Sequence, residues 1–195
     1  MQINKVGFTH FAILEDFWGK EWCERTIEAA QEWNLTQVPA GTYNGWKTGV
    51  QKRNIATFTD SYNLMYRAEP LSASWQKLDD AILEFNKATY NFELDEKSNV
   101  FMNEYHKGYE LSWHRDEDES VEDLFKRTLA NRISVSIFLN DDFDGGEFEL
   151  EGIGKWQPRA GTAIIFPSAQ LHRGAIVTKG TKYNLTYWRK GNRCR

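Results

Sequence analysis

One short stretch of the chain combines two residue types that bind metal ions. His114 and Asp116, in "ELSWHRD", are separated by a single residue. Side chains two apart on a β-strand point to one face, so this imidazole and this carboxylate can aim at one point. Ferrous iron in oxygen-using enzymes is held on one face by two histidines and one carboxylate, with open positions left for substrate and oxygen. The pair therefore predicts an iron site if a second histidine joins it. Without a second histidine, such a pair more often belongs to the start of a solvated acidic loop.

His172, in "QLHRGAIV", is the candidate for the second histidine because it is the only histidine downstream of the pair. It follows Asp116 by 56 residues, on another expected strand, and a closed sheet brings distant strands around one cavity. The remaining two histidines fit less well. His10 lies near the first expected strand and is interpreted as a surface or packing residue, and His106 precedes a glycine turn and is expected in a loop.

Lys182 stands ten residues after His172, on the next expected strand. A lysine inside a barrel is costly unless it is paired, and a carboxylate-bearing cosubstrate beside the metal would supply the partner. Tyr105, from another strand, would add a hydrogen bond. The alternative is a surface lysine on a strand edge, which strand phase alone leaves open.

The first half of the chain must supply elements that support these residues. Residues 10–17 read as a short strand, and residues 18–33 and 69–90 carry apolar residues at helical intervals. Pro70 near the first turn supports the second helix. Residues 43–54, rich in glycine and polar residues, are expected to form a loop.

From about residue 99 the helical period disappears and short strand-like runs follow one another. Seven or eight short strands with no helices between them predict a barrel or a double-sheet jelly roll, with the two helices packed outside. The fold class is therefore α+β, mainly β. The runs are residues 99–105, 110–116, 132–140, 146–152, 161–167, 170–177 and 182–188.

Composition narrows the class of protein. With 195 residues, 41% of them hydrophobic, we expect one domain over residues 1–195. The net charge of −4 and the lack of a basic stripe disfavour nucleic acid as a partner. Cys23 and Cys194 suggest neither a disulfide framework nor a zinc site, which favours a reducing compartment. No apolar run approaches about 20 residues and the N-terminus lacks a signal-peptide pattern, so we expect a cytoplasmic protein without membrane contact.

Three segments in order, "NEYHKGYELSWHRDEDE", "NRISVSIFLNDDFDGGEFEL" and "AGTAIIFPSAQLHRGAIVTKGTKYNLTYW", resemble a known family. They are similar to the double-stranded β-helix (jelly roll, cupin-like) core of the iron(II)/2-oxoglutarate-dependent dioxygenases, above all the prolyl 4-hydroxylase-like branch. The resemblance covers about residues 99–189. "LEDFWGKEWCERTIEAA" resembles that branch's N-terminal strand and helix more loosely. Residues 1–98 would then support a core formed by residues 99–190.

The resemblance implies roles for individual residues. It makes His114, Asp116 and His172 the iron ligands and catalytic centre. It makes Lys182 the partner of the distal carboxylate of 2-oxoglutarate, and Tyr105 a second contact to this cosubstrate. The implied cofactors are Fe(II), 2-oxoglutarate and O2, with ascorbate as a candidate reductant.

Two further features of the prolyl 4-hydroxylase-like branch have matching residues in this sequence. Arg132 falls where the prolyl hydroxylases place an arginine that lines the substrate groove, so it is the leading substrate-contact candidate; a strand-end charge in solvent is the alternative. Gly145, Gly146 and Glu147 match a Gly-Gly-Glu turn. We assign this turn a structural role, because glycine permits positive φ and a tight connection.

A second likeness is to the alkylation-repair (AlkB-type) demethylases, which use asparagine and tyrosine around the cosubstrate. It implies that Asn103 and Asn184 also line the 2-oxoglutarate pocket. Those enzymes carry an arginine where Lys182 stands and another where this chain has Trp188. Both departures weaken the demethylase interpretation.

The expected activity is hydroxylation of an unactivated C–H bond in an amino acid, peptide or protein substrate, with proline as the first candidate by analogy. The alternatives are an AlkB-type nucleic-acid demethylase and a non-catalytic jelly-roll binding module. The acidic residues from Glu117 to Asp123 read as a solvated loop or, less simply, as part of a lid. Core packing is the default role for Trp113, Trp156 and Trp188, and the oligomeric state is left open.

Overall fold

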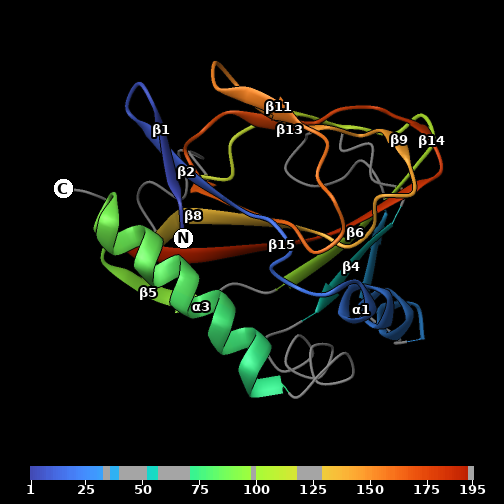
Figure 1. Cartoon of the computed structure of the whole chain (residues 1–195), viewed down its shortest axis with the longest axis horizontal. Coiled ribbons are helices and arrows are strands. Elements are labelled where there is room, and N and C mark those ends of the chain that lie inside the picture. The colour runs from blue at the N-terminus through green and yellow to red at the C-terminus, as the bar shows by residue number, and fades with distance from the viewer. Residues whose placement is uncertain (33–35, 40–51, 57–70, 98–99, 118–128, 193–195) are drawn as a thin grey trace.

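The computed structural model describes most of the chain. The described stretches are residues 1–32, 36–39, 52–56, 71–97, 100–117 and 129–192. Within them, two β-sheets face each other, and helices α1 (Lys20–Glu32) and α3 (Leu71–Ala88) lie on the outer side of the larger sheet (Figure 1). None of the described helices is long and apolar enough to cross a membrane.

The larger sheet contains nine of the described strands, in the order β1-β2-β12-β8-β15-β6-β4-β3, with β5 paired to β15. The strand β15 lies in its centre, antiparallel to both β8 and β6, although it comes last in the described chain. The strands are β1 (Ile3–Val6), β2 (Thr9–Leu14), β3 (Thr36–Pro39), β4 (Lys52–Ala56), β5 (Leu94–Lys97), β6 (Val100–His106), β8 (Leu129–Phe138), β12 (Ala163–Pro167) and β15 (Thr181–Asn192).

The smaller sheet faces the larger one and has the described strand order β11-β10-β13-β7. Two further strands, β9 and β14, pair with each other beside it. Both candidate histidines belong to the smaller sheet, at the end of β7 and the start of β13. The strands are β7 (Leu111–His114), β9 (Asp144–Gly145), β10 (Phe148–Leu150), β11 (Gly154–Trp156), β13 (His172–Gly174) and β14 (Val177–Lys179).

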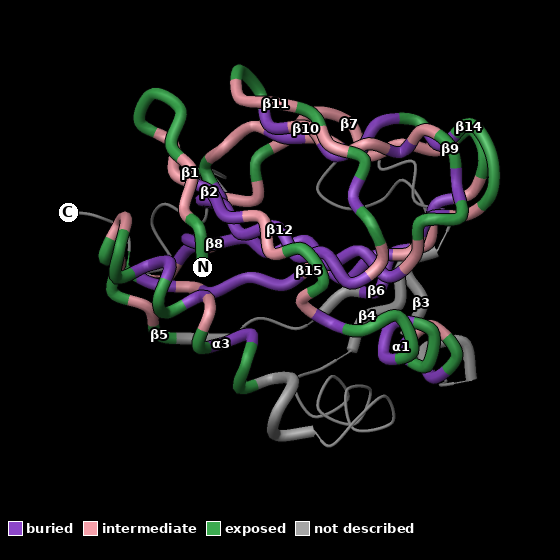
Figure 2. The backbone as a smooth tube through the Cα atoms, viewed as in Figure 1, coloured by how far each residue is buried: buried purple, intermediate pink, exposed green. Residues whose placement is uncertain are grey.

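Apolar side chains form one core on each side of the larger sheet. On the helix side, Leu78, Ile82 and Phe85 recur at intervals of three and four along α3 and are buried against the sheet. Between the two sheets, Phe148 and Phe166 belong to a second cluster. Figure 2 shows buried residues along the central strands, with exposed residues at many of the turns and on parts of both helices.

Two contacts fix the helices to the sheet. The Asp79 carboxylate of α3 and the Arg189 guanidinium of β15 form a buried ion pair at 3.0 Å. The Gly161 carbonyl accepts hydrogen bonds from the amides of Phe17 and Trp18 at 2.9 and 3.2 Å, just before α1 begins. The helices are therefore held by directed polar contacts as well as by apolar packing.

The expected architecture, facing sheets with helices outside, agrees with the structure. Helices α1 and α3 lie within the ranges predicted for them, and each of the seven strand-like runs overlaps a strand. The loop expected over residues 43–54 is wrong at residues 52–54, which belong to β4, and residues 43–51 lie outside the described residues. His106 was expected in a loop but ends β6.

Several strands were not predicted because they are short and carry little apolar alternation. The strands β1, β5 and β9 are extended because they pair with a neighbouring strand, not because their residues alternate between apolar and polar.

Candidate metal centre

Two antiparallel strands of the smaller sheet bring the two predicted histidines together. His172 of β13 is the direct register partner of His114 of β7, and their ring centroids lie 4.2 Å apart. Side chains of directly opposed residues share one face of a sheet. A single cross-strand pair thus brings together two histidines that are 58 positions apart in the sequence.

Asp116 joins the histidines from just beyond the end of β7. Its Oδ1 lies 3.4 Å from His114 Nε2, and its Oδ2 lies 3.5 Å from His172 Nε2. One candidate ligand atom from each of the three residues lies within 4.8 Å of the others. The structure therefore assembles the three predicted ligands, although Asp116 itself lies outside the strand on which it was expected.

The hydrogen bonds of the two histidines orient both rings. His114 Nδ1 lies 2.7 Å from the Ser112 carbonyl. His172 Nδ1 lies 3.0 Å from the Gln170 carbonyl. Because a carbonyl only accepts, each Nδ1 carries a hydrogen, and Nε2 presents a lone pair whenever its ring is neutral. Both Nε2 atoms face a carboxylate that also only accepts. With both rings neutral, three acceptors would converge on one point, an arrangement that a metal cation would satisfy.

Burial sets the protonation states of this cluster. Burial lowers the pKa of His172 to about 4, although the Asp116 carboxylate opposes that shift. Burial also works against the ionised form of Asp116, but His172, His114 and the Trp188 side chain outweigh it and hold the pKa of Asp116 below its usual range. At neutral pH His172 is neutral and Asp116 is ionised. Metal ligands require these two states.

The pocket that contains the three residues continues to Lys182. The Lys182 side chain is 4% exposed, and its Nζ donates to the Gly146 carbonyl at 2.6 Å. Nζ also lies 5.6 Å from the ring centroid of Tyr105 and 5.3 Å from that of Phe138. Burial lowers the pKa of Lys182 to about 8, against the attraction of Glu147. An ammonium has three hydrogens, so this lysine can also bind a carboxylate in the pocket.

The remaining predicted pocket residues divide into two groups. Tyr105 and Asn184 line the pocket with Lys182. Asn103 lies behind it, fully buried, and donates to Thr186 Oγ1 at 2.8 Å. Gly146 has a φ of 64°, so the Gly-Gly-Glu turn has the positive φ expected of it and also supplies the carbonyl that holds Lys182.

Arg132 does not belong to the residues that line the pocket. It is 8% exposed, and its guanidinium donates to the Asn192 carbonyl at 2.6 and 2.9 Å and to Glu117 Oε1 at 2.5 Å. The solvent-exposed alternative for Arg132 is wrong, and its geometry describes a structural clamp. Glu117 is correspondingly not a freely solvated acid, and the acidic residues from Asp118 to Asp123 lie outside the described residues.

Sequence reasoning does not predict several of the residues that line the pocket. Ser136 and Thr186 supply hydroxyls, and Leu111 and Phe148 supply apolar walls. Strand phase was the available signal, because Thr186 lies two and four positions from Asn184 and Lys182 on β15. Trp188 continues this series and also lines the pocket. Trp113 instead packs beneath Arg173, whose guanidinium carbon Cζ lies 4.9 Å from the centroid of the Trp113 ring.

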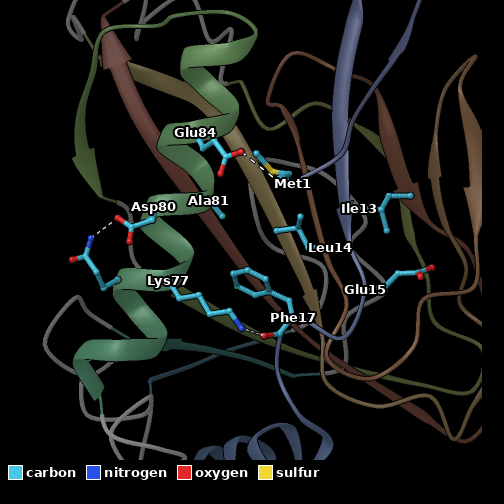
Figure 3. Close-up of a pocket in the computed structure, with 10 residues that line it drawn as sticks. Met1, Ile13, Leu14, Glu15, Phe17, Lys77, Asp80, Ala81 and Glu84 are labelled. Carbon is cyan, nitrogen blue, oxygen red and sulfur yellow. Dashed lines mark hydrogen bonds and ion pairs between the residues drawn. The ribbon is translucent and has the colours of Figure 1, made fainter.

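A larger open groove, of about 900 Å³, lies between β2 and α3 (Figure 3). Ala81 and Leu14 face it, Lys77 donates to the Phe17 carbonyl, and the Met1 amine lies 3.7 Å from Glu84. The described residues that line it include no histidine or cysteine. Its size therefore does not make it the candidate metal site, which is the smaller pocket lined by His114, Asp116 and His172.

Known proteins resemble this chain in sequence and in fold. Residues 100–190 match the family model of the 2OG-Fe(II) oxygenase superfamily. A PKHD-type hydroxylase from Picosynechococcus is 44% identical over 65 residues, which cover 31% of this chain and 30% of that protein. In this relative and in three other PKHD-type hydroxylases, the aligned region covers less than half of the hydroxylase's length.

Solved structures share the fold. A viral collagen prolyl hydroxylase from Paramecium bursaria Chlorella virus-1, in a 2OG complex, superposes with a TM-score of 0.68 at 16% identity, over 94% of this chain and 96% of that chain. A prolyl hydroxylase from Trichoplax adhaerens, in complex with a hypoxia-inducible-factor peptide fragment, gives a TM-score of 0.68 at 18% identity, over 92% and 82% of the two chains. The double-stranded β-helix fold is thereby confirmed.

The matched residues contain every member of the candidate site: the His-Asp-His cluster, the buried lysine and the strands that hold them. Sequence and fold lead to the same group of proteins. Residues 100–190 are therefore similar to the 2OG-Fe(II) oxygenase superfamily, and the chain is similar in sequence to PKHD-type hydroxylases and in fold to prolyl hydroxylases.

Proposed function

We propose that this protein is an Fe(II)/2-oxoglutarate-dependent dioxygenase that hydroxylates an unactivated C–H bond. In this proposal His114, Asp116 and His172 bind iron(II), and Lys182 binds the distal carboxylate of 2-oxoglutarate. The single observation that carries it is the convergence of two imidazole lone pairs and one ionised carboxylate in a buried pocket that continues to a buried ammonium.

When bound, iron(II) with 2-oxoglutarate and O2 supplies the oxidising chemistry, in which the cosubstrate is decarboxylated to succinate. The chain's own residues prepare the pocket for it. The Nδ1 bonds of His114 and His172 fix both rings. Lys182 supplies a positive charge where water is largely excluded, and an ion pair is stronger in such a place than at the surface. Phe148 and Leu111 form apolar walls that exclude water from the reacting groups.

For the substrate we propose a peptide or protein residue, with proline as the first candidate and a free amino acid as the next. The support is the shared fold with a prolyl hydroxylase that was solved with a peptide. Trp188, at the place where the demethylases carry an arginine, lines the pocket, and this departure argues against a demethylase. Ascorbate as reductant, a cytoplasmic location and one domain over residues 1–195 remain part of the proposal.

The test is succinate formation from 2-oxoglutarate with iron(II) and ascorbate, with proline-containing peptides and free proline as candidate substrates. We expect turnover by the native chain and a loss of at least about 100-fold in His172→Ala, because two ligands hold the metal less well than three. The matched control is His10→Ala, which removes a histidine that packs on Tyr90 instead of facing the site. Equal rates in the native and His172→Ala proteins would contradict the proposal, as would a lack of iron-dependent 2-oxoglutarate binding.

A further inference from the structure

Two buried serines adjoin the candidate metal centre. Ser134 of β8 donates from Oγ to Asp116 Oδ2 at 2.7 Å, and its Oγ lies 2.8 Å from Ser168 Oγ. Both serines are 0% exposed. A buried hydroxyl is costly unless it is hydrogen-bonded, so the two serines and the carboxylate satisfy one another.

The direction of these hydrogen bonds follows from the number of hydrogens available. An ionised carboxylate only accepts, so the single hydrogen of the Ser134 hydroxyl points to Asp116. Ser134 then has no hydrogen left for Ser168, and the Ser168 hydroxyl must donate to Ser134. The result is a directed chain from Ser168 to Ser134 to Asp116, in which each bond polarises the next.

Ser168 also holds the backbone of the same ligand. Its carbonyl accepts from the amides of Asp116 and Glu117 at 3.0 and 3.1 Å, and its own amide donates to the Arg132 carbonyl at 2.9 Å. Asn131 adds a bond from Nδ2 to the Asp116 carbonyl at 2.9 Å. Asp116 lies past the end of β7, where no strand pairing fixes it. Its position and its carboxylate orientation therefore depend on β8 and on the residue that follows β12.

We propose that Ser134 and Ser168 are positioning residues that orient the Asp116 carboxylate for metal binding before the metal arrives. This inference rests on the proposed function, because it takes the metal to be held by Asp116 with His114 and His172. A carboxylate already held in the binding orientation loses less freedom when the metal binds. Removing a partner that orients a metal ligand typically costs about 10- to 100-fold in affinity.

The experiment measures Co(II) binding to the purified chain by titration of the visible absorption spectrum, without any turnover. We expect Ser134→Ala to weaken Co(II) binding by about 10- to 100-fold and to alter the spectrum. Ser134→Thr keeps the hydroxyl and should restore an affinity close to native. Ser168→Ala removes only the first hydroxyl of the chain and keeps the carbonyl that holds the backbone, so it should weaken binding less than Ser134→Ala.

The matched control is Thr26→Val, which removes a hydroxyl that is equally buried and is bonded to the Trp22 carbonyl in α1. It should change stability but leave Co(II) affinity within about twofold of native. Native affinity in folded Ser134→Ala would overturn the positioning role alone. If Ser134→Ala does not fold, native affinity in Ser168→Ala overturns it. No Co(II) binding by the native chain would overturn the proposed function and this inference together.

Discussion

At the scale of single residues, the charge of Lys182 is the most sensitive feature of the pocket. Its burial lowers the pKa to about 8, so a modest rise in pH removes the charge that would bind a carboxylate. Below that pH the lysine is protonated, and above it each further pH unit reduces the protonated fraction about tenfold. The affinity for 2-oxoglutarate should therefore fall on the alkaline side.

We expect the Kd of 2-oxoglutarate for the metal-loaded protein to rise about tenfold between pH 7 and pH 9, as Lys182 loses its proton. Lys182→Arg should flatten this rise, because a guanidinium stays charged throughout that range. The measurement is isothermal titration calorimetry across the pH series. A native Kd that stays constant up to pH 9 would show that Lys182 is not the charge that binds the cosubstrate.

Arg132 has two candidate roles, a substrate contact and a structural clamp, and substitution of this residue distinguishes them. Its bonds to Asn192 and Glu117 predict that Arg132→Ala costs about 1 to 3 kcal/mol of unfolding free energy, because the Asn192 carbonyl and a half-buried carboxylate lose their donor. Urea unfolding measures this cost. Arg115→Ala is the control, since Arg115 is exposed and donates to the Ala169 carbonyl. An unchanged stability with a raised KM for a peptide would favour the substrate contact instead.

At the scale of elements, Gly161 determines how closely the segment before α1 approaches the larger sheet. Gly161 has a φ of 81°, and a Cβ placed there would lie 2.0 Å from the Trp18 carbonyl oxygen. Gly152 has a similar φ of 71° but nothing within 4 Å of such a Cβ. The two glycines thus separate the cost of backbone strain from the cost of a steric clash.

We expect Gly152→Ala to cost about 1 to 2 kcal/mol for its left-handed backbone. Gly161→Ala should cost about 2 kcal/mol more, because the start of α1 must move away from the sheet. Urea unfolding of both variants measures the difference. Equal costs would mean that the approach of Trp18 to Gly161 contributes nothing to stability.

The sequence predicted the elements whose pattern is set by their own residues. The helix α3 could be recognised from its apolar spacing, and β8 and β12 from their apolar runs. The proposed metal ligands and Lys182 could be recognised from the His-x-Asp spacing and from the order of the motifs that resemble the dioxygenases. Ser134 and Ser168 could not be identified, since serine is common and their role exists only through the register that brings β8, β12 and the end of β7 together.

At the scale of the whole molecule, one buried ion pair joins the helix layer to the centre of the larger sheet. Asp79 and Arg189 are 5% and 8% exposed, so neither charge is well solvated when its partner is removed. We expect Arg189→Ala to lower the unfolding free energy by about 3 to 5 kcal/mol. The double variant Asp79→Ala with Arg189→Ala should cost less than the sum of the single variants, as a double-mutant cycle by urea unfolding would show. Additive costs would mean that the pair is not coupled.

The central place of β15 has a consequence for the chain as it is synthesised. Its two long neighbours, β8 and β6, are translated first and do not pair with each other, so each keeps a row of open backbone groups until residues 181–192 leave the ribosome. An open strand edge on a nascent chain is a place where other chains can attach. The three proposed iron ligands are all translated before that strand begins, whereas Lys182 is its second residue. The lysine proposed to bind the cosubstrate is therefore synthesised as part of the strand that completes the larger sheet.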